Sequence, residues 1–377
     1  MKKQLIALAL VAAAALGAAA QSTIYNVRDY GVKGDSITDD APALQSLLDY
    51  VMEHGGGTLH FPRGFYRLAT IHEHNNVKAH LIIKPTAKVP GKRNYGMIRL
   101  EGESCAVTPC SYANHTGTDK SQVWDNGTII FSDILGELHT DPSVMPVSIL
   151  AAGGGSNIYS LNQAVIRISD LAFRAKAEDG EFPRLSGINM AYAATVYTDN
   201  VLVFASTRST ELTIPSSKGH YSAGFIGPRL WCNPEQEFRN LYVKSAFRYG
   251  FIFSEHANAS NLSAWNCECA YVFGKMDHSS YFARIHAQNC ADILVSLPVD
   301  FAGHTVGTSF IRIAQVGIEV NRGQRPEAFN YRTFVLDPDN RLYGSFDYHI
   351  VRSNFGADNS CFSADGGEHL RATPLFK

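Results

Sequence analysis

Side chains that can bind or deprotonate an acidic group recur at a regular spacing between residues 240 and 290. Three segments align at intervals of twenty-one residues, namely Asn240–Lys244, Asn261–Trp265 and Phe282–His286, and a short apolar run follows each. Side chains alternate between the two faces of a strand. The alignment therefore predicts two outward rows, Tyr242/Ser263/Arg284 and Lys244/Trp265/His286, and an inward set made of Leu241, Val243, Leu262, Ala264, Ala283 and Ile285.

The outward rows combine cations, a base and aromatic rings. Lys244 and Arg284 can neutralise a carboxylate, and His286 can then remove the proton on the adjacent carbon. We predict these three as catalytic residues, with Tyr242 and Trp265 as substrate-binding residues that offer flat faces to a sugar. Stacked rows of this kind favour an acidic polysaccharide as the partner. The alternative is a solvated sheet face whose charges serve only solubility.

A predicted turn one coil from Asp300 carries further polar groups. We predict Lys275, Asp277 and His278 in this turn as substrate-binding residues. A glycoside hydrolase needs a pair of carboxyl groups. Asp199, Asp277 and Asp300 are the alternative carboxylates that could provide it.

Many short strands must position these groups. Apolar, alternating segments such as Ile168–Phe173, Thr198–Phe204 and Ser309–Ile313 are separated by Gly, Asn, Asp and Ser. No long amphipathic helix is indicated after residue 54. This pattern is typical of an all-β solenoid whose coils bury their faces on one another.

The N-terminal region predicts one helix, over about residues 39–54. Thr38 or Asp39 can cap it, Pro42 fits only its first turn, and Gly55 to Gly57 end it. We interpret Asp39 and Asp40 as helix-capping residues and not as a catalytic pair. The apolar stripe of this helix consists of Leu44, Leu47, Leu48, Val51 and Met52.

Residues 25–67 resemble the N-terminal signature of the pectate-lyase-like superfamily, in the branch that includes rhamnogalacturonases and epimerases. The matching motifs are Asp29-Tyr30-Gly31, Thr38-Asp39-Asp40 and the stretch from Gly55 to Tyr66. The resemblance implies a single-stranded right-handed parallel β-helix with an N-terminal capping α-helix. We expect coils over about 58–355 and a C-terminal cap over about 356–377.

The resemblance does not fix the activity, because hydrolases, lyases, epimerases and phage tail proteins share this opening. The motifs of β-helix hydrolases similar to polygalacturonase are incomplete here: Tyr197-Thr198-Asp199 and Gly303-His304-Thr305 occur, without an interior Asp-Asp or a Gly-His-Gly. We therefore predict a polysaccharide lyase that acts by β-elimination. The alternatives are a glycoside hydrolase and a non-catalytic glycan-binding or structural β-helix. No cofactor is predicted; Ca²⁺ stays an alternative, although no adjacent Asp rows indicate a site for it.

The composition and the N-terminal residues indicate which partners the protein binds and where it is located. The 377 residues carry 33 basic and 35 acidic side chains and a net charge of −2, which disfavours a nucleic-acid partner.

Residues 1–20 are typical of a signal peptide, with Lys2-Lys3, an apolar run and Ala18 to Ala20. We expect cleavage between Ala20 and Gln21, export to the periplasm or the outside, one domain over 21–377 and no membrane partner after cleavage. The oligomeric state is not indicated.

Seven cysteines are compatible with disulfides in an exported protein. Cys105 and Cys110 could close a small loop, and the coil alignment stacks Cys269 over Cys290. The pairing stays open among Cys105, Cys110, Cys232, Cys267, Cys269, Cys290 and Cys361.

Overall fold

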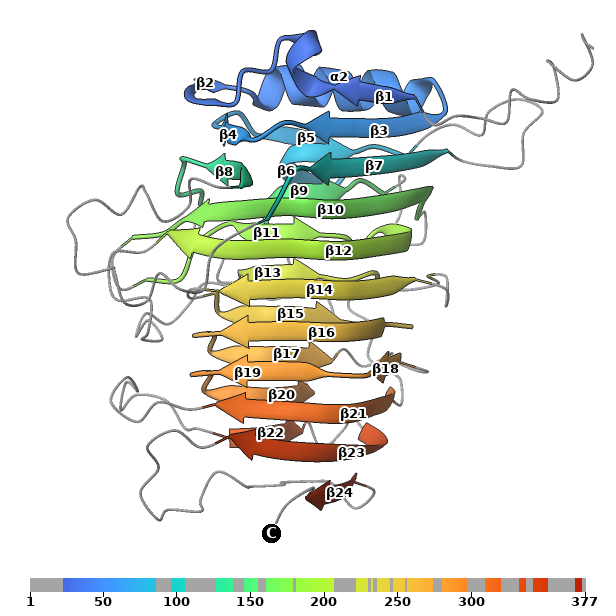
Figure 1. Ribbon diagram of the computed structural model, residues 1–377, viewed down its shortest axis with the longest axis vertical. Coiled ribbons are helices and arrows are strands. Elements are labelled where there is room, and N and C mark those ends of the chain that lie inside the picture. The colour runs from blue at the N-terminus through green and yellow to red at the C-terminus, as the bar shows by residue number, and fades with distance from the viewer. Residues whose placement is uncertain are drawn as a thin grey trace, which may run out of the picture.

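The protein is a right-handed parallel β-helix whose coils stack along its long axis, with one α-helix closing the N-terminal end (Figure 1). The predicted fold class is thereby confirmed. No described helix has the length and apolar character needed to cross a membrane. The predicted signal peptide lies outside the described residues. The computed structural model describes residues 23–85, 96–105, 127–137, 146–154, 161–178, 181–206, 222–229, 232, 236–244, 247–254, 256–273, 280–296, 309–319, 332–336, 342–351 and 370–374.

The larger of two sheets contains the strands that line the site. Its strands pair in parallel from coil to coil. Its main path runs through β1 (Ile24–Asn26), β3 (Gly56–Phe61), β7 (Met97–Gly102), β10 (Asn162–Lys176), β12 (Ala193–Ser206), β14 (Glu237–Lys244), β16 (Asn258–Trp265), β18 (Ser280–Phe282), β21 (Ser309–Glu319), β23 (Leu342–Val351) and β24 (Leu370–Pro374). Beside this path lie β2 (Asp35–Asp39), β4 (Gly64–Leu68), β8 (Thr128–Ser132) and β19 (Ile285–Gln288).

The smaller sheet closes the coil on its remaining side. It is also parallel, apart from the antiparallel pair β5–β6. Inward aromatic rings from its strands stack between coils, as Phe251 and Tyr271 do with ring centroids 5.1 Å apart. Its strands are β5 (His72–His74), β6 (Val77–Ile83), β9 (Ser148–Ala152), β11 (Ser186–Asn189), β13 (Ala223–Ile226), β15 (Tyr249–Phe253), β17 (Cys269–Phe273), β20 (Asp292–Ser296) and β22 (Arg332–Leu336).

The helix α2 (Ala41–Glu53) follows the short 3₁₀ helix η1 (Val27–Tyr30) and covers the open end of the first coils. The predicted apolar stripe of α2 is buried. Gln45 ties α2 to β6, because its Nε2 donates to the Ile82 carbonyl at 2.9 Å and its Oε1 accepts from the Ile82 amide at 2.7 Å. A terminal coil would otherwise expose its apolar interior and unpaired backbone.

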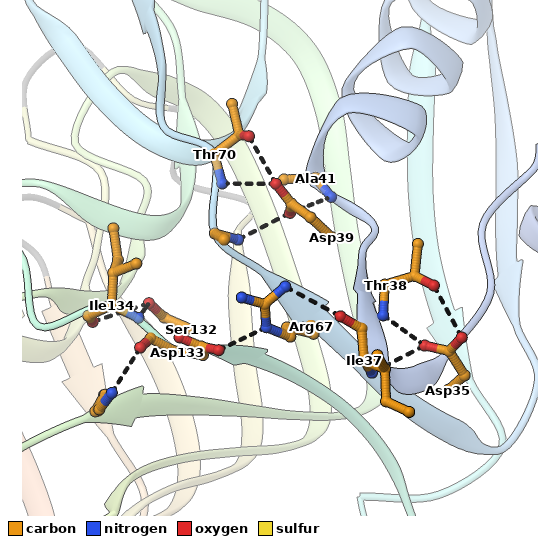
Figure 2. Close-up of polar contacts among 12 residues, drawn as sticks. Asp35, Ile37, Thr38, Asp39, Ala41, Arg67, Thr70, Ser132, Asp133 and Ile134 are labelled. Atoms are coloured by element: carbon orange, nitrogen blue, oxygen red, sulfur yellow. Dashed lines mark hydrogen bonds and ion pairs between the residues drawn. The ribbon is translucent and has the colours of Figure 1, made fainter.

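Asp39 and Asp40 hold backbone at this end of the protein, and Figure 2 shows the contacts of Asp39. Asp39 accepts hydrogen bonds from the amides of Ala41, Ala69 and Thr70 and from the Thr70 hydroxyl. Burial raises the pKa of Asp39, but these hydrogen bonds outweigh it and lower the pKa overall. Asp40 makes no side-chain capping bond and instead accepts from the Lys33 and Gly34 amides. The capping prediction is therefore confirmed for Asp39, which bonds the first helical amide, whereas Asp40 occupies the N-cap position and caps the helix through its backbone carbonyl alone.

The five cysteines in the described part of the chain, Cys105, Cys232, Cys267, Cys269 and Cys290, are free thiols. The predicted stacking of Cys269 over Cys290 is wrong, because the strand register pairs Cys269 with Asp292. The thiol of Cys290 instead donates to the Ala264 and Gln288 carbonyls, both at 3.5 Å. Cys110 and Cys361 lie outside the described residues.

One residue with left-handed backbone bends each of the four long strands β10, β12, β14 and β16. These residues form what we name the corner ladder: Asp170 (φ 55°), Asn200 (φ 55°), Asn240 (φ 46°) and Asn261 (φ 59°). The register aligns them in successive coils. Each bend divides its strand into an N-terminal half, on what we name the first face, and a C-terminal half, on the second face.

Side-chain hydrogen bonds connect the corner ladder from coil to coil. Asn200 Nδ2 donates to Asp170 Oδ1 at 2.5 Å, and Asn261 Nδ2 donates to Asn240 Oδ1 at 2.8 Å. Asn240 Nδ2 donates to Asp199 Oδ1 at 2.9 Å, one residue before the corner of the preceding coil. Asn and Asp are among the few residues other than Gly that adopt this conformation readily, so the ladder fixes both the bend and the coil register.

Asn240→Ala is expected to lower the free energy of unfolding by about 3–4 kcal/mol. The loss of two hydrogen bonds contributes about 1 kcal/mol each, and an alanine held at left-handed φ costs about 1–2 kcal/mol. Denaturant unfolding of the wild type and the variant measures the difference. Ser260→Ala, at the adjoining position on the next coil, is the control and should stay within about 0.5 kcal/mol of wild type. Equal effects of the two substitutions would contradict this role of the ladder.

Candidate functional site

A cleft of about 420 Å³ opens on the second face, beside the corner ladder. It lies where β12, β14, β16 and β19 follow one another in adjacent coils. The cleft gathers all three predicted catalytic residues and two of the predicted substrate-binding residues. Its lining consists of Cys105, Asn200, Leu202, Tyr242, Lys244, Asn261, Ser263, Trp265, Arg284 and His286.

The strand register places these residues differently from the sequence alignment. Tyr242 pairs with Ser263 as predicted, but Ser263 pairs with His286 and not with Arg284, and Trp265 pairs with Gln288. The predicted rows are therefore wrong between the second and third coils. Phe253 pairs with Phe273 while Asn258 pairs with Tyr281, so the connection after β17 is longer than the one after β15.

The corrected register also moves Ala283 and Arg284. Leu241, Val243, Leu262, Ala264 and Ile285 are buried as predicted. Ala283 is partly exposed, contrary to the prediction, because the chain turns the corner there. The pairs Ala259–Phe282 and Leu262–Ile285 align Arg284 with Asn261, so Arg284 takes the corner position in its coil.

His286 is fixed from both sides of its strand. On the core side, its backbone amide and carbonyl both bond the hydroxyl of the fully buried Tyr271, at 3.2 and 2.6 Å. On the cleft side, its Nδ1 lies 3.1 Å from Ser263 Oγ. Burial lowers the pKa of His286, and the positive charge of Arg284 lowers it further. The imidazole is therefore held neutral to lower pH than an exposed histidine, which suits a base.

A second chain of contacts reaches the same serine. Trp265 Nε1 donates to Ser263 Oγ at 2.6 Å, and Lys244 Nζ lies 4.0 Å from the centre of the Trp265 ring. Lys244 is also 5.8 Å from the centre of the Tyr242 ring. Burial lowers the pKa of Lys244. Aromatic faces stabilise an ammonium group without neutralising it, so Lys244 stays available to an anion.

The charges of the cleft have one sign. Lys244 and Arg284 have no carboxylate within ion-pair distance among the described residues, and no described lining residue is an Asp or Glu. Arg284 is exposed and stays charged at any physiological pH. Uncompensated cations around a cavity attract an anion.

Two uncharged groups complete the lining. Tyr242 Oη accepts a hydrogen bond from Asn261 Nδ2 at 3.1 Å, and burial raises the pKa of Tyr242, so its phenol stays protonated. Cys105 Sγ donates to Asn200 Oδ1 at 2.9 Å. Burial and the charge of Asp170 raise the pKa of Cys105 to about 11, so its thiol is not a nucleophile at neutral pH.

The other predicted site residues do not join this cleft. Asp199 lies on the first face, where it accepts from Arg239 at 2.7 Å and from Asn240 at 2.9 Å. Lys275, Asp277, His278 and Asp300 lie outside the described residues. Among the residues that the structure describes, no cluster of His, Cys, Asp and Glu could hold a metal ion.

Sequence reasoning missed Asn200, Asn261, Leu202 and Cys105 as lining residues, and it left Ser263 without a role. The sequence does contain a signal for the asparagines. Each of the residues Asn200, Asn240 and Asn261 directly precedes the Val or Leu that begins a second-face segment. No comparable signal marks Cys105, because this residue does not belong to the aligned repeats.

Comparisons with known proteins support the architecture. A family model described as "Rhamnogalacturonase A/epimerase, pectate lyase-like" matches residues 24–293. Alginate lyase 7 of Azotobacter vinelandii is 42% identical over 67 residues, which are 18% of this chain and 8% of that protein. Mannuronan C5-epimerase AlgE4 of the same organism is 41% identical over 49 residues, which are 13% of this chain and 9% of that protein. The matched segments thus span less than a tenth of these relatives. The solved AlgE4 A-module aligns with a TM-score of 0.38 at 15% identity and covers 93% of this chain and 100% of that chain.

Arg284→Gln is expected to raise the pKa of His286, because it removes a positive charge that disfavours the imidazolium. An NMR titration of the imidazole protons, assigned with a His286→Ala sample, measures the change. Arg239→Gln is the matched control: its guanidinium pairs with Asp199 on the first face, and its loss should leave the His286 titration unchanged. An unchanged titration in Arg284→Gln would show that Arg284 does not set the proton affinity of this base.

Proposed function

Because the chain belongs to the rhamnogalacturonase A/epimerase, pectate lyase-like family, we propose that its cleft binds a uronic-acid polysaccharide and cleaves it by β-elimination. The observation that carries the proposal is the lining of the cleft, which joins Lys244, Arg284 and His286 without a described carboxylate. Such a lining attracts a sugar carboxylate and places a base beside it. The N-terminal segment supports a setting in the periplasm or outside the cell, where such polymers are met.

The first step is removal of the proton from C5, the carbon that bears the carboxylate. Arg284 and Lys244 pair with the carboxylate and stabilise the charge that develops on it. His286 Nδ1 donates to Ser263 Oγ, and Nε2 takes the proton. The electrons of the C–H bond pass into the carboxylate as an enolate.

The second step expels the sugar attached at C4. The enolate electrons form the C4–C5 double bond, and the C4–O bond breaks with its electron pair on the departing oxygen. Tyr242 lines the same cleft as a protonated phenol and donates its proton to that oxygen. Trp265 offers a flat face to a sugar ring. The products are an unsaturated uronate and a new chain end.

An epimerase shares the first step and differs in the second, since the enolate is reprotonated from the opposite side and no bond to oxygen breaks. The curated relatives include a protein named as a lyase and proteins named as mannuronan epimerases. Epimerisation of a uronate is therefore the second candidate.

Hydrolysis has less support in this cleft. It requires an acid and a second carboxylate on either side of the glycosidic bond. Asp199, the predicted carboxylate that the structure describes, is engaged by Arg239 and Asn240 on the other face.

The test is incubation of the mature protein with a panel of uronic-acid polymers, with and without Ca²⁺. We expect the ultraviolet absorbance of the unsaturated uronate to rise, and His286→Ala to lower kcat by about 100- to 10,000-fold with KM little changed. New reducing ends without that absorbance would favour hydrolysis. Exchange of the C5 proton with solvent deuterium, without new chain ends, would favour epimerisation. Binding without any of these changes would favour a glycan-binding protein.

Ser263→Ala tests the positioning of the base. Loss of the hydroxyl frees the imidazole to rotate, so we expect kcat to fall by roughly tenfold, equivalent to about 1.4 kcal/mol, and the acidic limb of the pH profile to move. Ser263→Thr keeps the hydroxyl and should restore both. A pH profile that stays unchanged in Ser263→Ala would show that Ser263 does not act through His286.

A further inference from the structure

A second pocket, of about 470 Å³, lies on the first face beside the same corner. It crosses β7, β10, β12 and β14, and it shares Asn200 with the cleft on the second face. The two hollows therefore meet at the corner ladder. The second pocket is lined by Arg99, Arg167, Ile168, Ser169, Asp170, Tyr197, Thr198, Asp199, Asn200, Glu237 and Arg239.

Two arginines that line this pocket occupy paired positions on adjacent strands. Arg99 and Arg167 pair in register on adjacent strands, and Tyr197 is the next residue of the same row. The guanidinium of Arg167 lies 4.9 Å from the centre of the Tyr197 ring. Two like charges on neighbouring strands, about 4.8 Å apart in backbone spacing, repel each other unless an anion lies between them.

Arg167 contacts the Tyr197 ring but has no carboxylate partner among the described residues. Its Nε is enclosed and makes no hydrogen bond to any residue that the structure describes, and no carboxylate there lies within ion-pair distance of it. Among the residues described, the carboxylate within ion-pair distance of Arg99 is that of Glu101, at 3.9 Å. An enclosed guanidinium N–H without an acceptor is costly, and a carboxylate ligand supplies the acceptor.

The acidic residues of the pocket are already engaged elsewhere. Asp199 accepts from Arg239 at 2.7 Å and from Asn240 at 2.9 Å. Asp170 accepts from Asn200 at 2.5 Å. Glu237 lies 4.0 Å from Arg239. Two of the three carboxylates, Asp199 and Glu237, therefore pair with Arg239, and none of the three lies within ion-pair distance of Arg99 or Arg167 in the described part of the chain.

We infer that Arg99 and Arg167 bind the anionic group of another sugar of the same polymer, so that the chain crosses the corner at Asn200 from the second face to the first. This inference rests on the proposed function for the class of ligand, a uronate carboxylate. Arginine suits such a group because its planar fork can bond both carboxylate oxygens. A sulfate ester on a sugar presents the same chemistry and is distinguished in the test.

The test measures binding by calorimetry to a length series of oligouronates, from dimer to octamer, in the His286→Ala protein, which is expected not to consume them. Arg167→Gln should bind the shortest oligomers as the parent does and the longest about tenfold more weakly, as expected for one lost charged hydrogen bond. Arg167→Lys should fall between the two, because it keeps the charge without the fork. Neutral oligosaccharides of matched length should show no loss on Arg167→Gln, and sulfated oligosaccharides tested in parallel distinguish a sulfate ester from a uronate as the ligand.

Arg312→Gln is the matched control. Arg312 lies on β21 in the same outward row, with its guanidinium 5.9 Å from the centre of the Tyr281 ring, and it lines neither pocket. It should leave binding unchanged at every length. Unfolding midpoints equal to that of the parent exclude misfolding as the cause of any loss.

The outcomes separate this inference from the proposed reaction. Length-dependent loss with Arg167→Gln supports the subsite even if the wild-type protein shows no turnover. Turnover of polymer by wild type, with Arg167→Gln unaffected at all lengths or weakened equally at all lengths, overturns the subsite and leaves the reaction standing. A loss seen only with sulfated chains overturns the uronate as its ligand, and an absence of binding to every oligouronate overturns the subsite and the substrate class together.

Discussion

The left-handed residue at the corner of four successive coils is the constraint on which both pockets depend. A strand of L-residues bends sharply only where one residue leaves the extended region, and Asp and Asn tolerate that conformation better than most. In the corner ladder their side chains also bond between coils, as Asn261 and Asn240 do at 2.8 Å. Since the bend recurs at one register, the outward side chains on either side of it align in rows.

Both pockets are consequences of this alignment. Tyr242, Ser263 and His286 are distant in sequence, yet they meet because each stands at the same step beyond the corner of its coil. Arg284 occupies the corner position after Asn261, where a guanidinium replaces the side-chain amide and places a permanent charge at the cleft. Asn200 borders both hollows, so the ladder that shapes the coil also joins the two faces.

Residue patterns within single segments made many of the buried positions predictable. The stripe of α2 and the inward positions of β14 and β16 follow from periodicity within one segment, and both are buried as predicted. The register between β16 and β19 depends on the length of a distant connection, which periodicity does not report. The predicted side chains still share one cleft because the error was two residues, and a shift by two keeps every side chain on its own face. Two features could be found only from the true strand register. They are the contact between Ser263 and His286 and the pairing of Arg99 with Arg167 on the first face.

The cations of the cleft have two opposing effects on the proposed reaction. A cation that attracts a carboxylate also withdraws proton affinity from a nearby base, as Arg284 does from His286. On the proposed reaction this conflict resolves when the substrate binds, because its carboxylate neutralises Arg284 and returns proton affinity to the imidazole. A carboxylate built into the lining would cancel the same charge permanently and weaken the attraction for substrate. On the proposed reaction, the described lining, with cations and no acid, therefore couples the arrival of the anion to the strength of the base that acts on it.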